Sequence, residues 1–83
     1  MPRFIDQHPS DPNTSPEMIA FIMQRLQSGE PDEFGERGIN VFVGPSRTFC
    51  YTEAPTADAV VKSHAALGIK VELDDIEEIQ ALP

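Results

Sequence analysis

The sequence predicts an α+β domain whose strands and helices follow one another in the order β-α-β-β-α-β. Two segments carry apolar residues at helical spacing between capping signals, and four short segments have the composition or the position of strands. A turn-forming stretch between the two middle strand segments predicts a hairpin. With 83 residues, the chain suffices for one small domain with one small core.

The first strand and the first helix are predicted over residues 3–8 and 16–28. In residues 3–8, every second side chain would share one face of the strand. A loop rich in Pro, Ser, Asn and Asp follows. Ser15 is a typical N-cap for the helix, and Gly29 follows the last residue of its apolar pattern. This pattern has the period of a helix with one apolar face.

The second half of the chain is predicted to add a hairpin, a helix and a final strand. Residues 39–43 and 47–53 form the two hairpin strands, joined by a Gly-Pro-Ser turn. Thr56 is predicted to cap the second helix, which ends before Gly68. Residues 76–82 are then expected to close the sheet.

This order of elements is the ferredoxin-like split βαβ arrangement. Its usual sheet is four-stranded and antiparallel in the order 4-1-3-2, with two helices on one face. The other face is left bare, and a bare, partly apolar face on a small domain favours a homodimer packed sheet to sheet. We therefore expect a single domain over residues 1–83 and a dimeric α/β-barrel-like assembly.

The composition argues against two classes of partner. Fourteen acidic and six basic residues give a formal net charge of −8, which repels nucleic acid and anionic lipid headgroups. No apolar run approaches the ~20 residues of a membrane span, and residues 1–12 lack the apolar segment of a signal peptide. The single cysteine cannot form an intrachain disulfide, so we expect a cytoplasmic protein.

The scarcest side chains are also those with metal-ligand chemistry, namely one cysteine and two histidines: His8, Cys50 and His64. Thiolate, imidazole and carboxylate together suit nickel, copper, zinc or iron better than calcium or magnesium. In the predicted topology, His8 ends the first strand and Cys50 lies in the first half of its antiparallel neighbour. His64 lies in the last turn of the second helix, which returns to the same end. We therefore expect these three side chains to meet there.

Two acidic residues are candidates for a carboxylate ligand. Asp6 would share a strand face with His8 and is the better placed of the two. Glu53 would lie on the opposite strand face from Cys50 and nearer the other end of the domain. The sequence leaves the strand register open, so both acids remain candidates.

Each candidate also has an ordinary structural interpretation. Cys50 can be a small buried hydrophobe, and His64 can be a cation that faces the helix dipole at a C-terminus. His8 can be a loop residue, and Glu53 can be a solvated or capping acid. Only the expected convergence in the fold favours a metal site.

Three stretches of the chain resemble a known family. FIDQH near the start, TFCYTEAP in the third strand and AVVKSHAALG in the second helix resemble the small nickel-binding proteins of actinobacterial type, also catalogued as a domain of unknown function. The resemblance implies a ferredoxin-like homodimer that binds nickel, with no established catalysis. By position, its metal-binding features fall on Asp6, His8, Cys50, Glu53 and His64. Members of that family often carry a second histidine after the first, where this chain has Pro9.

The preferred function is therefore a non-catalytic protein that binds nickel, or another divalent transition metal, in sequestration or homeostasis. The first alternative is a small dimeric-barrel enzyme of isomerase, lyase or monooxygenase type, with a pocket near His64. There, His64 would act as a general base, Tyr51 or Asp6 would orient a substrate, and Cys50 is a conceivable nucleophile. The second alternative is an interaction module whose acidic loop, residues 29–38, meets a basic partner.

Overall fold

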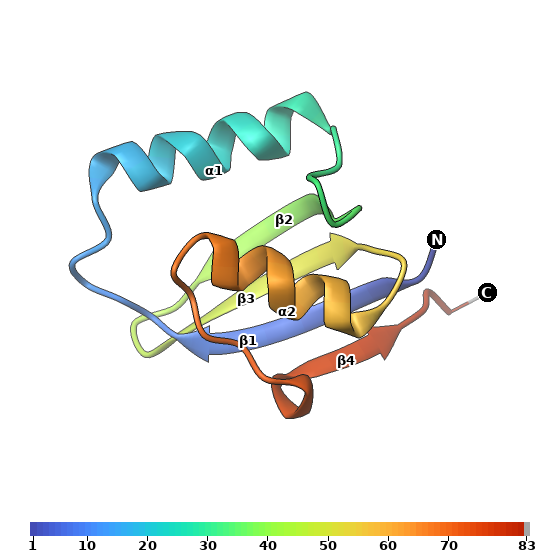
Figure 1. Cartoon of the computed structure of the whole chain (residues 1–83). Coiled ribbons are helices and arrows are strands. Elements are labelled where there is room, and N and C mark those ends of the chain that lie inside the picture. The colour runs from blue at the N-terminus through green and yellow to red at the C-terminus, as the bar shows by residue number, and fades with distance from the viewer. Residues whose placement is uncertain (83) are drawn as a thin grey trace.

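The computed structural model describes residues 1–82 as one antiparallel four-stranded sheet with two helices and a short 3-10 turn (Figure 1). The elements are β1 (Arg3–Pro9), α1 (Pro16–Ser28), β2 (Arg37–Val43), β3 (Arg47–Glu53), α2 (Ala57–Ala66), η1 (Leu73–Asp75) and β4 (Ile76–Ile79). The sheet order is β2-β3-β1-β4, which is the expected ferredoxin-like order. The predicted fold class is confirmed.

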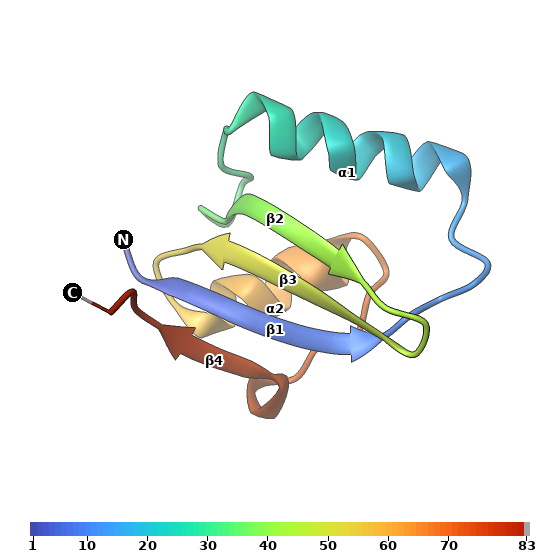
Figure 2. The same ribbon diagram turned by 180° about the vertical axis from the view of Figure 1, so that it is seen from behind.

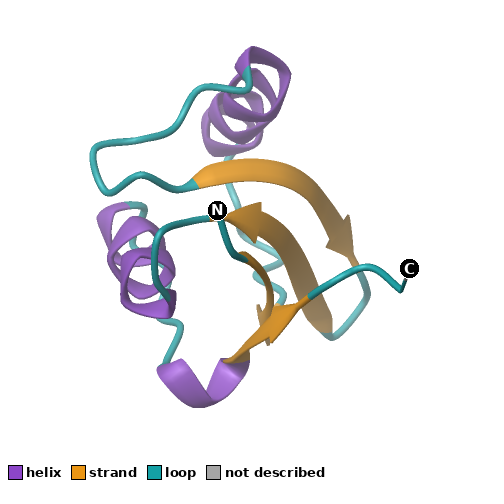
Figure 3. Ribbon diagram, turned by 90° about the vertical axis from the view of Figure 1, so that its right-hand side faces the viewer, coloured by secondary structure: helices purple, strands orange, loops and turns teal. Residues whose placement is uncertain are grey.

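Both helices lie on the same side of the sheet (Figure 3). The second helix, α2, crosses over the centre of the sheet at β1 and β3, whereas α1 lies along the edge strand β2 (Figures 1 and 2). The core is correspondingly small and lies beneath α2. Its buried members are Phe4, Ala54, Ala59 and Val60, against which Phe34, Ala57 and Ile76 pack.

The predicted helix caps are present. The Ser15 hydroxyl accepts a hydrogen bond from the backbone N–H of Met18 at 3.1 Å, and Gly29 ends α1 with a left-handed φ of 66°. The Thr56 hydroxyl accepts a hydrogen bond from the backbone N–H of Ala59 at 3.1 Å, which starts α2. These local signals therefore define where both helices begin.

Three strand boundaries differ from the prediction, of which the end of β1 differs by one residue, at Pro9 instead of residue 8. β2 begins at Arg37, before the predicted start at residue 39, and has an irregularity in its pairing with β3 between Gly38 and Asn40. β4 ends at Ile79 instead of residue 82. Ile79 pairs with Arg3 of β1, and the preceding Pro2 has no N–H with which to continue the ladder.

One close contact joins α1 to the sheet. A Cβ atom added at Gly38 would lie 2.9 Å from Leu26 Cδ2, a distance that carbon atoms do not tolerate. A larger residue at position 38 would therefore require the end of the Leu26 side chain to move. The helix nevertheless has no buried residue, as judged within residues 1–82.

Neither α1 nor α2 covers the opposite face of the sheet (Figure 2). Phe42 and Phe49 pair across β2 and β3 on this face and are 53% and 39% exposed. Ile5 and Tyr51 pair beside them across β1 and β3. This is the bare, partly apolar face from which a sheet-to-sheet dimer is predicted. No helix of the described chain has the length and apolar character needed to cross a membrane.

Candidate metal centre

Four side chains with metal-ligand chemistry meet between the sheet and α2, and we call them the donor cluster: Asp6, His8, Cys50 and His64. Each offers one ligand atom, and the four atoms all lie within 4.8 Å of one another. They come from β1, β3 and α2, which are far apart in the sequence. The cluster has the residue types and the spacing of a group that can hold one metal ion.

The strand register explains why the sheet contributes three of the four donors. Asp6 pairs directly with Cys50 across β1 and β3, and His8 pairs with Thr48. Directly opposed residues in an antiparallel pair share a face, and so do residues two apart on one strand. Asp6, His8 and Cys50 therefore all face α2. This register answers the question that the sequence leaves open about Asp6 and Cys50.

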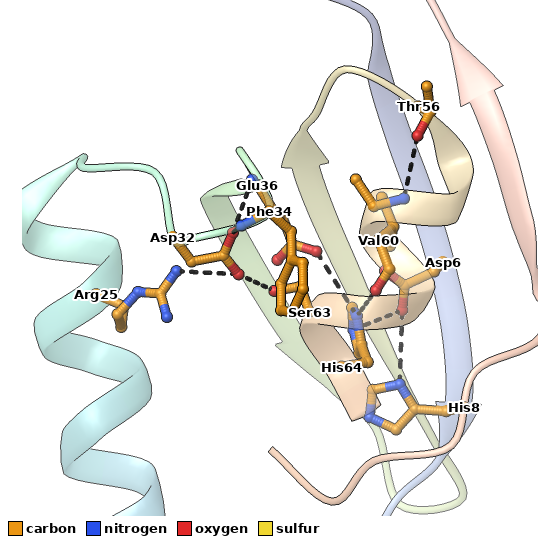
Figure 4. Close-up of polar contacts among 11 residues, drawn as sticks. Asp6, His8, Arg25, Asp32, Phe34, Glu36, Thr56, Val60, Ser63 and His64 are labelled. Carbon is orange, nitrogen blue, oxygen red and sulfur yellow. Dashed lines mark hydrogen bonds and ion pairs between the residues drawn. The ribbon is translucent and has the colours of Figure 1, made fainter. Parts of the chain in front are cut away.

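His64 reaches the cluster from the last turn of α2 with a defined orientation (Figure 4). Its Nδ1 lies 2.9 Å from the carbonyl oxygen of Val60. A carbonyl can only accept, so Nδ1 carries a hydrogen and donates it. The other ring nitrogen, Nε2, faces Asp6 Oδ1 at 3.3 Å. Metal-binding histidines commonly use one ring nitrogen for a carbonyl in this way and leave the other for the ion.

His8 completes the group from the end of β1. Its Nδ1 lies 3.6 Å from Asp6 Oδ1, and its ring meets that of His64 edge-on, with the centroids 5.7 Å apart. Within the described chain, this buried Nδ1 has no hydrogen-bond partner. Both imidazoles therefore present a ring nitrogen to the same carboxylate oxygen.

Asp6 is buried, with only 1% of its surface exposed. Neither of its carboxylate oxygens has a hydrogen-bond partner among residues 1–82, although both histidines lie close. A buried carboxylate without hydrogen bonds is costly unless a positive charge compensates it. The site therefore requires a cation next to Asp6, either an imidazolium or a metal ion.

Without a metal, the imidazolium of His64 supplies that charge. Burial alone would lower the pKa of His64, but the nearby Asp6 carboxylate, together with the neighbouring Cys50, raises it to about 11. Burial alone would raise the pKa of Asp6, but the nearby imidazoles of His64 and His8 lower it below its ordinary value. The metal-free cluster is thus a buried Asp6–His64 ion pair.

Burial raises the pKa of the Cys50 thiol above its ordinary value. The thiolate is the form that attacks substrates and binds metals. A protonated, buried thiol is a poor nucleophile, whereas a bound cation would itself favour the thiolate. The environment of Cys50 is therefore better suited to a metal ligand than to a catalytic nucleophile.

Glu36 is an acidic residue beside the donor cluster, and its sequence position indicates only that it belongs to the acidic loop of residues 29–38. Its Oε2 lies 3.8 Å from His64 Nδ1, and burial raises its pKa to about 7. Asp32 holds this turn, because its Oδ1 accepts hydrogen bonds from the backbone N–H groups of Phe34 and Glu36 at 2.9 Å each (Figure 4). Asp32 is a residue from which an Asx-type turn can be predicted. The neighbouring residues in the sequence do not indicate that the Glu36 side chain points inward.

Glu53, the fifth predicted ligand, lies outside the donor cluster. It is at the end of β3, where it pairs with Arg3 at 3.6 Å and with Arg37 at 3.5 Å. Both arginines are its register partners in the neighbouring strands. The structure thus brings together four of the five predicted ligands and places Glu53 in a separate ion-pair network.

Comparison of the chain with protein-family models, curated proteins and solved structures gave no match. The resemblance to small nickel-binding proteins therefore stays a prediction. The chemistry of the donor cluster is the basis on which a function can be argued.

Proposed function

We propose that this protein binds one divalent transition-metal ion per chain and acts in metal sequestration or homeostasis, without catalysis. The observation that carries the proposal is the donor cluster itself, whose four ligand atoms lie within 4.8 Å of one another. The buried oxygens of Asp6, which lack hydrogen-bond partners within residues 1–82, support it. A metal ion would supply the positive charge that this carboxylate requires.

Nickel is the metal that we propose, and zinc is its nearest competitor. One thiolate, two imidazoles and one carboxylate form a borderline-soft set that both ions accept. The resemblance of the FIDQH and TFCYTEAP stretches to nickel-binding proteins favours nickel. Elemental analysis of protein purified without a histidine tag distinguishes the two metals.

The test of the metal site is a nickel titration followed by absorption spectroscopy. Nickel is expected to produce a thiolate-to-metal charge-transfer band at one equivalent per chain. Cys50→Ser should remove this band and weaken nickel binding by more than about 100-fold, since loss of an outer-shell partner alone typically costs about 10–100-fold.

Glu53→Gln is the matched control, because it changes a predicted ligand that lies outside the donor cluster. It should leave both the band and the affinity unchanged. If nickel produces no band, or if Cys50→Ser binds nickel as tightly as the parent protein, the metal function is refuted. Loss of binding in Glu53→Gln would instead assign the carboxylate role to Glu53.

We also propose that two copies pack through the bare sheet face to form the homodimer expected from the sequence. Phe42 and Phe49 give this face an exposed apolar centre, and a small domain gains stability by covering such a surface. The mass of the tag-free protein in solution tests this assembly. A monomer at micromolar concentration would contradict it.

The enzyme alternative has one observation in its favour, a cavity that reaches His64. Its proposed residues are less well placed. Tyr51 pairs with Ile5 on the bare face and accepts a hydrogen bond from Arg3 at 2.9 Å, so it points away from His64. Asp6 and Cys50 belong to the donor cluster. The metal function therefore uses these side chains more completely than a metal-free active site would.

A further inference from the structure

A cavity of about 100 Å³ lies between the two helices and the β2–β3 half of the sheet. Its α1 wall consists of the apolar residues Phe21, Ile22 and Leu26 together with Arg25. Its inner end reaches three members of the donor cluster, His8, Cys50 and His64. The cavity therefore joins an apolar surface to the candidate metal centre.

Two further polar groups in the cavity wall lack a hydrogen-bond partner within residues 1–82. Thr52 and Glu36 are only 3% and 8% exposed. Within the described residues, Thr52 Oγ1 and Glu36 Oε2 lack hydrogen bonds, and both residues line the cavity. Buried polar groups normally find a partner. Because neither residue belongs to the donor cluster, a metal ion there would leave these two groups unsatisfied.

We infer that this cavity binds a small, neutral and mostly apolar molecule that carries one hydroxyl group at one end. The hydroxyl would hydrogen-bond to Thr52 or Glu36, beside the donor cluster, and the apolar part would contact α1. An enclosed apolar cavity of about 150 Å³ holds benzene, so the volume of about 100 Å³ here encloses about four non-hydrogen atoms. The cavity is partly open to solvent, so a ligand of about six or seven non-hydrogen atoms would extend beyond its open side. This inference deepens the proposed function, because it adds a class of ligand that would bind beside the proposed metal ion. The contacts of this ligand with Thr52, Glu36 and α1 do not involve the ion.

Phenol and toluene are matched probes, because they have nearly the same shape and differ by one hydroxyl group. Each is titrated into the metal-free, full-length protein and followed by the amide NMR signals of Leu26, Val41 and Leu67, which line the cavity. Phenol is expected to shift these signals saturably and to bind about tenfold more tightly than toluene. Tenfold corresponds to one net hydrogen bond.

Variants of the polar wall test which groups hold the hydroxyl. Thr52→Val removes that hydroxyl at nearly constant volume, and Glu36→Gln keeps the shape of the side chain while removing its acidity. At least one of these two variants should lower the affinity for phenol to that for toluene. A tenfold preference that persists in both variants would overturn the inference.

Filling the cavity provides the matched steric test. Val41→Phe should abolish binding of both probes, and Val43→Phe should not. Val43 lies two residues further along β2, is 76% exposed and lies outside the cavity wall. Circular dichroism checks that each variant folds, and the two wall variants keep the test valid if Val41→Phe does not fold.

The inference and the metal function fail in distinguishable ways. If phenol causes no saturable shift at the cavity signals, or binds no more tightly than toluene, the ligand inference is overturned, whatever nickel does. If phenol binds no more tightly than toluene, water alone would satisfy the hydrogen-bonding groups of Thr52 and Glu36. Phenol binding that Val41→Phe abolishes would support the inference even if no nickel–thiolate band formed.

Discussion

The two helices begin with similar capping signals but contribute differently to the molecule. α1 has 13 residues, none of them buried within the part of the chain that is described, and it exposes Ile19, Phe21 and Met23. α2 has only 10 residues and buries four of them: Ala59, Val60, Ser63 and His64. The shorter helix therefore supplies the core and a candidate metal ligand, and the longer one forms an outer wall of the cavity.

This difference shows that position over the sheet, and not helix length, decides what a helix contributes. α2 lies over the central strands β1 and β3, where its inner face is covered (Figure 1). α1 lies along the edge strand β2, where only one side of it meets the sheet (Figure 3). Elements with few buried apolar contacts open at low free energy. We therefore expect α1 to be the less protected helix, in keeping with a wall that admits a ligand.

The largest expected difference between the helices is in core packing. Val60 of α2 is fully buried, so Val60→Ala should lower the free energy of unfolding by about 2 kcal/mol through lost burial and a residual cavity. Ile19 of α1 is 48% exposed, and Ile19→Ala should stay within about 0.5 kcal/mol of the parent. Urea unfolding of the metal-free protein measures both. Equal losses would show that α1 is packed as firmly as α2.

The next largest effect concerns pH and depends on His64 of α2. Its folded pKa is raised from 6.5 to about 11, so between these values the folded state holds a proton that the unfolded state has lost. The stabilisation from pairing with Asp6 is therefore complete below about pH 6.5 and is lost as the pH rises toward about 11. Metal-free protein should lose about 1 kcal/mol of unfolding free energy between pH 7.5 and 8.5.

Nickel should reverse the sign of this dependence, because the metal displaces protons from its ligands and the stabilisation it adds grows with pH. Unfolding curves at the two pH values, with and without one equivalent of nickel, measure both slopes. His64→Gln should flatten the metal-free profile. A flat profile in the parent protein would contradict the buried Asp6–His64 ion pair.

The smallest expected effects concern Asp32, which receives one side chain from each helix (Figure 4). Ser63 of α2 donates a hydrogen bond to its Oδ2, and Arg25 of α1 lies 3.6 Å from the same atom. Ser63 is buried, so Ser63→Ala should cost about 1 kcal/mol. The ion pair of Arg25 is partly exposed, so Arg25→Gln should cost at most about 0.5 kcal/mol.

Thermal unfolding resolves these two effects, since about 1 kcal/mol shifts the midpoint of a domain of this size by roughly 4–8 °C. A larger loss in Arg25→Gln than in Ser63→Ala would mean that Asp32 holds α1 to the domain more strongly than it holds α2. That result would contradict the view of α1 as the loosely attached wall.

Local chemistry was sufficient to predict the elements and their order. Ser15 and Thr56 start the two helices as predicted, and the β2–β3 hairpin has the predicted turn between its strands. Capping and turn signals act over a few residues, so they can be read from the sequence directly. The end of β4 was predicted three residues too late, because it depends on where its partner strand stops offering hydrogen bonds.

The donor cluster could be predicted only in part. Alternation along β1 and β3 predicts which residues share a face, but a register shift of two residues preserves every face while separating Asp6 from Cys50. The observed register pairs Asp6 with Cys50 and leaves Glu53 with Arg3 and Arg37. The burial of Glu36 likewise depends on a loop folding back against α2.

The sequence by itself therefore determined the helices, the strands and the scarcity of ligand side chains in this protein. Only the tertiary structure decided which acids stand beside the histidines and the thiol. The physical reason is that caps and turns depend on neighbours in the chain, whereas ligand distances depend on strand register and helix docking, which are set by packing between distant segments.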